Sequence, residues 1–472
     1  MNKIFTLISL LYTVNIYSQT ADTNTHNAMN DSIVARFNRK DYKSVYELAG
    51  DNFKKYSSEK SFIDFLTSIN GIGAILKTEL IEDIGDFKYY KWICEKHKLQ
   101  LILNVQKDGK FKVFGLSDFV PVVNPSTIIF SDNPLKSPQD MDVDKAIKKY
   151  YLNTKTASIS MVIIKNKMTY FYNYSNSNKN VKVAADKNTC YEIGSLTKTF
   201  TGILLAQAVI DKKIKLDDDI RKYLDGSYPN LEYEGNPIRI IHLANHTARI
   251  AGKPGIPENF KKQVPYDSLN PYRNYTMEMF WEALHTMSID TIPGIQYDYS
   301  NMGAALLGHI LAKAYHMSYL QLVEKYITKP LRMNDTKMTL SAKQMKRFPK
   351  GFDEQGNETS YWDLPSFTAA GALRSTTYDM AKYLKANLEA KTAAIKLSQK
   401  TTFISNDNTV GMYWGIGKTL NEEVTIGHNG GTGGYKSKIQ MLPSRGIGLV
   451  ILTNSSVDIT EMGYELQLRL TK

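Results

Sequence analysis

Cysteine is almost absent from this chain. Cys94 and Cys190 are the only two among 472 residues, and two thiols cannot form the disulfide framework that holds many small exported domains together. We expect them in different domains as buried free thiols, with pairing as the alternative. No cysteine follows the apolar N-terminal segment directly, so we expect no lipid attached to a new N-terminal Cys.

Long apolar runs are also missing. After the N-terminal segment no stretch reaches 18 consecutive apolar residues, so the sequence predicts no transmembrane span in the mature chain. The N-terminus itself is different, because Lys3 precedes an apolar stretch from Ile4 to Tyr17 and a polar segment begins at Gln19. This pattern is typical of a signal peptide over residues 1–18. We therefore expect an exported protein, periplasmic or secreted.

The chain has no concentrated block of charge, although its formal net charge is +12. Its 59 Lys and Arg exceed its 47 Asp and Glu, but the lysines lie in short scattered groups such as Lys145, Lys148 and Lys149. Zinc-finger spacing and clusters of basic and aromatic residues are both missing, which argues against nucleic acid as a partner. A solvated basic surface and contact with an anionic cell-envelope component are both compatible with this charge.

A metal site is not predicted either. His242 and His246 have the spacing of a zinc pair on a helix, but Leu243 follows His242 where a metalloprotease has Glu, and no third ligand stands out. We expect His246 to satisfy backbone groups beneath a cleft. Gly417-Lys418-Thr419 lacks the earlier glycine of a phosphate-binding loop, so nucleotide binding is not predicted from it.

The length of the chain predicts two domains. Apolar residues first recur at helical spacing, up to about Ile69, and later alternate with polar ones, most clearly from Leu99 to Val105. Helices followed by an antiparallel sheet predict a small α+β domain over residues 25–118. Residues 119–140 contain four prolines among polar residues, which is typical of a linker.

The second domain is predicted to cover residues 141–472 and to begin with a helix up to Leu152. Strand patterns occur at both of its ends, at 158–165, 168–174, 424–426, 435–442 and 446–453. A closing helix begins near Ile459, and a mostly helical stretch lies between the two strand groups. The pattern predicts an α+β fold in which helices flank an antiparallel sheet built from both ends, with a helical subdomain.

Ser195 and Lys198 are the first residues that suggest catalysis. They open a segment with apolar residues at helical spacing, so an offset of three brings both side chains to one helix face. A desolvated lysine has a lowered pKa and can take the proton of a serine hydroxyl, which makes the serine a nucleophile. Ser57 and Lys60 have the same spacing in a predicted helix of the first domain, where we expect a solvated pair.

Tyr299 and Asn301 follow Pro293-Gly294 and precede a glycine-containing helix. A tyrosine at such a junction can face a cleft, and a phenol beside a lysine ammonium is pushed toward phenolate, which could carry the serine proton to a leaving group. Asn301 offers an amide to a substrate carbonyl and to the lysine. Two further Tyr-x-Asn triplets begin at Tyr174 and Tyr272, and we expect both in surface turns.

The glycine-rich stretch from His428 to Tyr435 lies between two predicted strands. Glycines beside a strand edge let a substrate approach the backbone, so His428, Gly430 and Gly431 are predicted substrate-binding residues. The Gly431 N–H could pair with that of Ser195 to hold an oxyanion. A simple hairpin turn is the alternative.

Three motifs of this chain, in their order, resemble those of the serine β-lactamase and penicillin-binding protein superfamily: Ser195-x-x-Lys198, Tyr299-x-Asn301 and His428-Asn429-Gly430. The resemblance is strongest to the class C-like esterase and D,D-peptidase branch of that superfamily. The resemblance covers about residues 142–470. It implies that Ser195 attacks the carbonyl of an ester or amide and that water later releases the acyl group. It implies no cofactor. The first domain is similar to cone-shaped modules related to nuclear transport factor 2.

One departure from the family bears on the substrate. Class C lactamases have Lys-Thr-Gly at the position of His428-Asn429-Gly430, so a group that titrates near neutrality replaces a fixed positive charge for a substrate carboxylate. We therefore expect an esterase or D-amino-acid peptidase with a small-molecule or peptide acyl substrate, and weak or absent β-lactam hydrolysis. The alternative is a penicillin-binding or sensing protein of the same fold without turnover.

Overall fold

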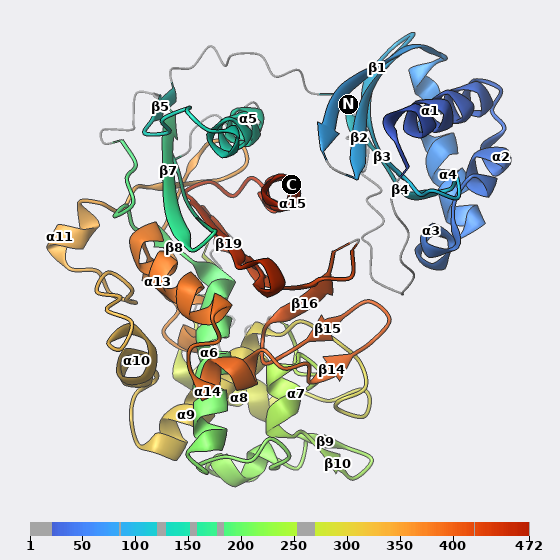
Figure 1. Ribbon diagram of the computed structural model, residues 1–472. Helices are drawn as coiled ribbons and strands as arrows, with labels where there is room; N and C mark the ends of the chain where they lie inside the picture. Colours follow the sequence, from blue (N-terminus) through green and yellow to red (C-terminus); the bar gives the residue numbers. More distant parts are fainter. Residues whose placement is uncertain are drawn as a thin grey trace. The chain divides into compact units, whose positions relative to one another are not determined.

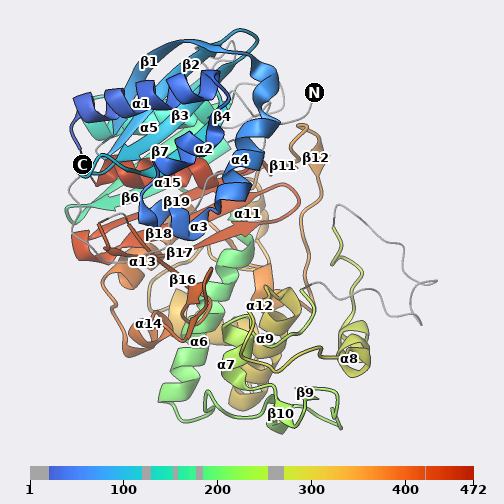
Figure 2. The same cartoon turned by 90° about the vertical axis from the view of Figure 1, so that its right-hand side faces the viewer.

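The computed structural model describes residues 21–84, 86–119, 129–151, 158–176, 184–252, 270–419 and 421–471 (Figure 1, Figure 2). The predicted signal peptide, residues 1–18, lies outside the described residues. The chain divides into two compact units; the first holds the residues before 124 with segments 418–423 and 468–472, and the second holds the rest. Cys94 lies in the first unit and Cys190 in the second, and both are buried free thiols, as predicted.

The first unit consists of helices followed by an antiparallel sheet, as the sequence pattern predicts. Its elements are α1 (Thr23–Asn38), α2 (Tyr42–Glu47), α3 (Asp51–Tyr56), α4 (Glu59–Ser68), the 3₁₀ turn η1 (Asn70–Ile72), β1 (Ile75–Ile84), β2 (Phe87–Cys94), β3 (Lys98–Val105) and β4 (Phe111–Asp118). The four strands pair in sequence order. They form an up-and-down sheet whose alternating apolar residues face the helices.

Aromatic rings fill the space between the helices and the sheet of the first unit. Phe53 of α3 and Phe111 of β4 are both buried, with ring centroids 5.0 Å apart. The buried Trp92 indole donates its N–H to Asn30 Oδ1 over 2.9 Å, so its polar atom is satisfied. The α+β character of this unit is as expected, while its relation to nuclear transport factor 2 modules stays a prediction.

The second unit is built on a nine-stranded sheet of order β14-β15-β16-β17-β18-β19-β6-β7-β5. Its strands are β5 (Ile129–Ser131), β6 (Ser158–Lys165), β7 (Met168–Asn176), β14 (Phe403–Ile404), β15 (Thr409–Val410), β16 (Gly415–Lys418), β17 (Val424–Gly431), β18 (Lys436–Leu442) and β19 (Ile447–Thr453). β19 pairs with β6 in antiparallel register. The two ends of the unit therefore share one sheet, as predicted.

The segment predicted as a linker contributes to this sheet. Residues 120–128 lie outside the described residues, but Ile129–Ser131 forms the edge strand β5 and pairs with β7. Asp132 fixes the end of β5, because its carboxylate accepts the backbone N–H and the amide N–H of Asn173 over 2.7 and 2.6 Å. Pro134 lies between β5 and α5, and Pro138 is the first residue of α5, where the missing N–H of a proline costs no helix hydrogen bond.

Helices cover both faces of the nine-stranded sheet (Figure 1). α5 (Pro138–Tyr151) and α15 (Thr460–Leu470) lie together on one face, joined by an ion pair of 2.7 Å between Lys149 and Glu461. α13 (Thr377–Leu388) packs on the other face through Leu384, which leaves no room for a side chain at Gly448 of β19. No helix in the described ranges is both long and apolar enough to cross a bilayer.

The helical part of the second unit lies beyond this second face (Figure 2). Its further helices are η2 (Gly194–Leu196), α6 (Thr197–Ile210), η3 (Ile220–Tyr223), α7 (Ile240–Ala244), α8 (Met277–Thr286), α9 (Asn301–Tyr315), α10 (Tyr319–Val323), the π-turn η5 (Glu324–Thr328), α11 (Ala342–Met345), α12 (Thr368–Gly371) and α14 (Ala393–Ser398), with η6 (Pro443–Arg445) between β18 and β19. Short paired strands are β8 (Tyr191–Glu192) with β13 (Arg374–Ser375), β9 (Glu232–Tyr233) with β10 (Asn236–Pro237), and β11 (Gly351–Phe352) with β12 (Glu358–Thr359).

α6 is the central helix of the second unit. Eleven of its 14 residues are buried, from Thr197 to Ala206 and at Ala208. A helix that is apolar on nearly all sides is stable only inside a core. Its first turn carries Lys198 and follows the 3₁₀ turn that carries Ser195, so the predicted catalytic pair belongs to a helix that is buried in the core.

Candidate active site

Ser195 lies in the tight turn η2 that leads into α6. Gly194 before it has a φ of +48°, in the left-handed region that disfavours residues with a Cβ. A Cβ at Gly194 would also lie 2.7 Å from the backbone N of Gly431 on β17. Two independent constraints therefore require glycine at this position, and together they hold the serine turn against the edge of the strand.

Lys198 contacts Ser195 from one turn further along the helix. Its Nζ lies 3.0 Å from Ser195 Oγ and 2.7 Å from both Asn301 Oδ1 and the carbonyl oxygen of Ala370. The side chain is fully buried, and burial lowers its pKa well below the ordinary value of lysine. The three oxygen partners belong to neutral groups, so none of them restores the charged form as a carboxylate would.

Tyr299 reaches Ser195 from the other side. Its hydroxyl donates to Ser195 Oγ over 2.7 Å, and Lys198 Nζ lies 4.8 Å from the centroid of its ring. Burial of the hydroxyl raises the pKa of Tyr299 above its ordinary value. The predicted shift toward phenolate is therefore wrong, because the desolvation that disfavours the charge of Lys198 also disfavours a phenolate.

His246 fixes the backbone on both sides of Tyr299. Its Nδ1 accepts the N–H of Ser300 over 3.0 Å, and its carbonyl accepts the N–H of Asp298 over 2.6 Å. The imidazole also lies against the Tyr299 ring, with centroids 4.3 Å apart. Burial lowers the pKa of His246 well below its ordinary value, so the ring is neutral and Nδ1 is free to accept. This confirms the prediction that His246 satisfies backbone groups beneath the cleft.

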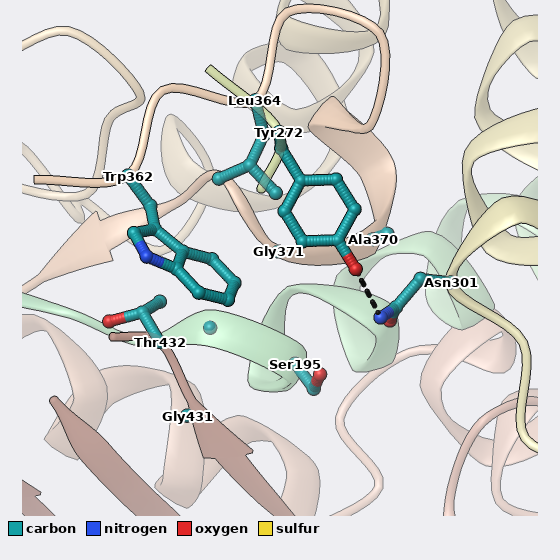
Figure 3. A pocket seen from close by; sticks show the side chains of 10 residues that line it. Ser195, Tyr272, Asn301, Trp362, Leu364, Ala370, Gly371, Gly431 and Thr432 are labelled. Atoms are coloured by element: carbon teal, nitrogen blue, oxygen red, sulfur yellow. Dashed lines mark hydrogen bonds between the residues drawn. The ribbon is translucent and has the colours of Figure 1, made fainter. Parts of the chain in front are cut away.

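A cleft of about 270 Å³, partly open to solvent, lies beside Ser195 (Figure 3). It is lined by Gly194, Ser195, Tyr272, Asn301, Trp362, Leu364, Ala370, Gly371, Gly431 and Thr432. The structure thus brings together the predicted Ser195, Asn301 and Gly431. Sequence reasoning missed Trp362, which belongs to no motif that signals chemistry, and it set aside Tyr272 although that residue begins a Tyr-x-Asn triplet.

The triplet at Tyr272 lies in a turn, as predicted, with Arg273 and Asn274 exposed, but its tyrosine is not at the surface. Tyr272 is buried, and its hydroxyl accepts a hydrogen bond of 3.0 Å from Asn301 Nδ2. The triplet at Tyr174 was also predicted in a surface turn, and this is wrong, because it lies buried in β7. Ser57 and Lys60, predicted on one helix, are separated by the break between α3 and α4.

The stretch predicted as a glycine-rich loop is a strand as far as Gly431, because β17 continues to that residue. Burial, with the nearby Lys198, lowers the pKa of His428 to about 4, so the predicted titration near neutrality is wrong. A Cβ at Gly430 would lie 2.3 Å from the carbonyl oxygen of Ile193. Gly430 therefore packs beneath the serine turn, and its neighbour Gly431 lines the cleft.

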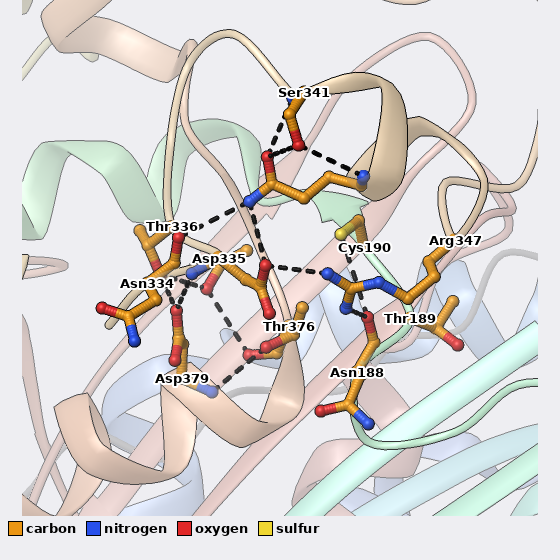
Figure 4. A network of polar contacts seen from close by, with 12 residues as sticks. Asn188, Thr189, Cys190, Asn334, Asp335, Thr336, Ser341, Arg347, Thr376 and Asp379 are labelled. Atoms are coloured by element: carbon orange, nitrogen blue, oxygen red, sulfur yellow. Dashed lines mark hydrogen bonds and ion pairs between the residues drawn. The ribbon is translucent and has the colours of Figure 1, made fainter. Parts of the chain in front are cut away.

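A polar network holds the segment that leads to Ser195 (Figure 4). Arg347 donates to the carbonyl of Asn188 and pairs with Asp335 at 2.8 Å. The backbone N–H of Asp335 in turn donates to Asp379 over 2.7 Å, and that of Cys190 to the carbonyl of Arg347 over 2.8 Å. Because β8 follows Cys190 directly, the network anchors the strand from which the serine turn begins.

A family model described as Beta-lactamase matches residues 143–470. This chain belongs to that family. It is 25% identical over 350 residues to a β-lactamase of Pseudomonas fluorescens, which covers 66% of this chain and 93% of the relative. It is also 25% identical over 351 residues to the D-alanyl-D-alanine-carboxypeptidase/endopeptidase AmpH of Escherichia coli K12, covering 70% of this chain and 88% of AmpH.

Solved structures agree on the fold of the family. A β-lactamase/D-alanine carboxypeptidase from Yersinia pestis superposes with a TM-score of 0.61 at 23% identity, covering 71% of this chain and 99% of that one. A class C β-lactamase gives a TM-score of 0.61 at 22% identity, covering 72% and 97%. The chain is thus an enzyme of the serine β-lactamase and penicillin-binding protein superfamily, with its α+β fold.

Proposed function

We propose that this enzyme is an exported hydrolase that cleaves an ester or amide through an acyl-enzyme on Ser195. The observation that carries the proposal is the pair of contacts on Ser195 Oγ, with Lys198 Nζ at 3.0 Å and the Tyr299 hydroxyl at 2.7 Å. A serine held between an amine and a phenol has a proton acceptor and a proton donor within hydrogen-bond distance. Nucleophilic catalysis by a serine requires both.

Lys198 is the proposed general base. A neutral amine has two N–H groups and one lone pair, and Asn301 Oδ1 and the Ala370 carbonyl, both at 2.7 Å, can accept the two N–H groups. The lone pair then points to Ser195 Oγ. Because burial lowers the pKa of Lys198, this neutral form is accessible near neutral pH. As Oγ bonds to the substrate carbonyl carbon, its proton passes to Nζ.

Tyr299 is the proposed proton donor to the leaving group. Burial raises its pKa, so the phenol keeps its proton at neutral pH. When the tetrahedral intermediate collapses, the leaving group takes the phenol proton, and the proton held on Lys198 replaces it. The pair thus carries one proton from Ser195 to the leaving group, and the same steps in reverse activate water for deacylation.

The backbone N–H groups of Ser195 and Gly431 are the proposed oxyanion donors. Both residues line the cleft, and the close approach of Gly194 to Gly431 N supports their adjacency. Ser195 also lies at the N-terminal end of α6, where helix N–H groups favour negative charge. Fixed donors of this kind typically contribute about a hundred- to a thousandfold in rate each.

Uncharged esters and amides are the proposed substrates. Above a pH of about 4 the His428 imidazole is neutral, and none of the ten described residues that line the cleft is charged. The lining residues therefore offer a substrate carboxylate no positive charge, although Lys436 Nζ lies 3.3 Å from the position of a Cβ at Gly431. Weak or absent β-lactam hydrolysis is proposed because a neutral His428 stands where class C lactamases have Lys. The name of AmpH makes a D-alanyl-D-alanine amide the second substrate class to test.

Export is proposed from the signal-peptide pattern of residues 1–18. The first unit is proposed to contact anionic cell-envelope polymers through its lysines, which lie largely on exposed positions. Fractionation of cells that produce the full chain tests both points. Recovery of the protein from the cytoplasm with an intact N-terminus would contradict export.

Hydrolysis assays on matched serine variants test the proposed function. Wild-type protein, Ser195→Ala and Ser57→Ala are each given p-nitrophenyl acetate, a D-alanyl-D-alanine peptide and nitrocefin. We expect repeated turnover of the ester by wild type and Ser57→Ala, and a loss of at least about a thousandfold in Ser195→Ala. Unchanged turnover in Ser195→Ala would contradict the site. A folded wild type that is labelled at Ser195 by a fluorophosphonate, yet turns over none of the three, would be a non-turnover binding protein.

A further inference from the structure

The wall of the cleft that faces Ser195 is aromatic (Figure 3). Tyr272 and Trp362 meet edge to face with centroids 5.3 Å apart, and the buried Leu364 completes the wall beside them. Phe367 supports Tyr272 from behind, with centroids 4.8 Å apart. A wall of two rings and one aliphatic side chain favours a flat apolar group by contact area and by ring packing.

The position of Tyr299 decides which part of the substrate this wall touches. The leaving group must lie on the side of the phenol that protonates it, while the acyl group extends away from it. Gly431 of the proposed oxyanion hole lines the cleft. Tyr299 and His428 do not line it, although the structure describes both residues. The cleft therefore lies on the acyl side of Ser195.

A buried ion pair fixes the backbone of Trp362. Glu192 Oε1 accepts the N–H of Trp362 over 2.8 Å, and Arg374 Nη2 donates to the Trp362 carbonyl over 3.0 Å. Glu192 and Arg374 are themselves 3.2 Å apart, and both side chains are less than a tenth exposed. Because Glu192 precedes the serine turn by three residues and pairs with Arg374 between β8 and β13, the wall and the nucleophile are held by the same short strands.

We propose that Tyr272, Trp362 and Leu364 form the acyl-group pocket, and that this pocket selects an uncharged planar acyl group such as an aryl or arylalkyl group. The proposal rests on the proposed function of Ser195 as nucleophile. Trp362 is the specificity-determining residue of the pocket. The pair of Glu192 and Arg374 holds its backbone, and its ring packs against Tyr272 before substrate arrives. Such preorganisation saves the entropy cost of ordering a side chain on binding.

Esters with one leaving group and different acyl groups test the pocket. We compare kcat/KM for p-nitrophenyl phenylacetate and p-nitrophenyl acetate in wild type, Trp362→Ala and Trp362→Leu, with Trp281→Leu as a control because Trp281 on α8 does not line the cleft. Loss of the ring should lower the ratio of phenylacetate to acetate by about tenfold in Trp362→Ala. Trp362→Leu keeps apolar volume without a planar face, so its ratio should lie between those of wild type and Trp362→Ala. Trp281→Leu should keep the wild-type ratio.

A second measurement needs no turnover. Phenylmethanesulfonyl fluoride and methanesulfonyl fluoride both sulfonylate a serine; Oγ bonds to sulfur, fluoride leaves and the hydroxyl proton passes to the base. The ratio of their rates at Ser195 should fall about tenfold in Trp362→Ala. An unchanged ratio in both Trp362 variants, or an equal loss for both reagents, would overturn the pocket. Absence of ester turnover with a wild-type sulfonylation preference would instead overturn the proposed function and leave the pocket standing.

Discussion

Ser57 with Lys60 and Ser195 with Lys198 have the same spacing but lie in opposite surroundings. The Lys60 side chain is 86% exposed and its Nζ lies 2.7 Å from the Asp64 carboxylate, which raises its pKa. Lys198 is fully buried among neutral oxygen acceptors, and burial lowers its pKa. The first lysine is held in its charged form, and the second is driven toward its neutral form.

The contrast indicates that the proposed role of Lys198 depends on its burial and on its contact with Ser195, and not on the Ser-x-x-Lys spacing alone. An exposed lysine with a carboxylate partner cannot accept a proton at neutral pH, and such a surface pair contributes little to stability because water screens it. A buried lysine without a carboxylate costs folding free energy, which the rest of the fold must offset. Four substitutions or conditions would break or sharpen this comparison.

The largest effect is expected from removing the two amines. Lys198→Met removes the proposed base and should lower kcat/KM for p-nitrophenyl acetate by about a thousandfold. Lys60→Met removes the matched exposed amine and should leave kcat/KM within a factor of about two. An equal loss of kcat/KM in the two variants would contradict the idea that burial makes Lys198 the base.

The next effect is expected at Tyr299. Tyr299→Phe keeps the ring against His246 but removes the proposed proton donor, so kcat/KM for phenyl acetate should fall by about a hundredfold. The loss should be smaller for p-nitrophenyl acetate, because p-nitrophenolate leaves without a proton. Tyr378→Phe, on the exposed side of α13, is the matched control. A loss that is the same for both leaving groups would contradict the role as donor.

The pH dependence should follow Lys198. Its amine is active when neutral, so kcat/KM should fall about tenfold per pH unit below its pKa and level off at a pH well under the usual range of lysine. His428, with a pKa of about 4, should add no inflection near neutrality. The measurement is kcat/KM of wild type and of His428→Gln as a function of pH between 5 and 9. An inflection near pH 6.5 that disappears in His428→Gln would contradict it.

The smallest effect is expected at His246, which positions Tyr299 without touching Ser195. His246 has a φ of +59°, which Asn tolerates, and an Asn amide oxygen can replace the Nδ1 acceptor. His246→Leu leaves the Ser300 N–H unpaired, so kcat should fall about tenfold and stability by about 1–3 kcal/mol. His246→Asn should recover most of the lost kcat and most of the lost stability. Steady-state kinetics measures the first and urea unfolding the second. No difference between the two variants would contradict a positioning role.

The sheet of the second unit was predictable because its signals are local. Asn166 and Lys167 both adopt left-handed φ values of +53° and +62° in the tight turn between β6 and β7, which matches the two-residue hairpin expected from the strand pattern. Ser195, Lys198 and Tyr299 could be predicted for a similar reason. Each lies at a helix start that the sequence marks with glycine or with apolar periodicity.

The electrostatics and the wall of the cleft could not be predicted in this way. The phenolate form assigned to Tyr299 and the near-neutral pKa assigned to His428 both failed because burial is a property of the folded chain. Tyr272 and Trp362 reach Ser195 from positions about 75 and 165 residues away. Only the fold brings such residues together, and no local pattern distinguishes a cleft aromatic from one in the core.

The pairing of β6 with β19 has a consequence for how the chain folds during its synthesis. Val162 lies opposite Val450. β6 can pair with β7 as soon as that hairpin is made, but a nascent chain that has already made the Ser195 turn must grow by more than half of the 472-residue length before β6 can pair with β19. Such distant contacts fold slowly because a long loop must close first. Gly431, the proposed oxyanion donor, lies at the end of β17, so a chain that stops before this strand would lack both the central sheet strands and this part of the proposed site.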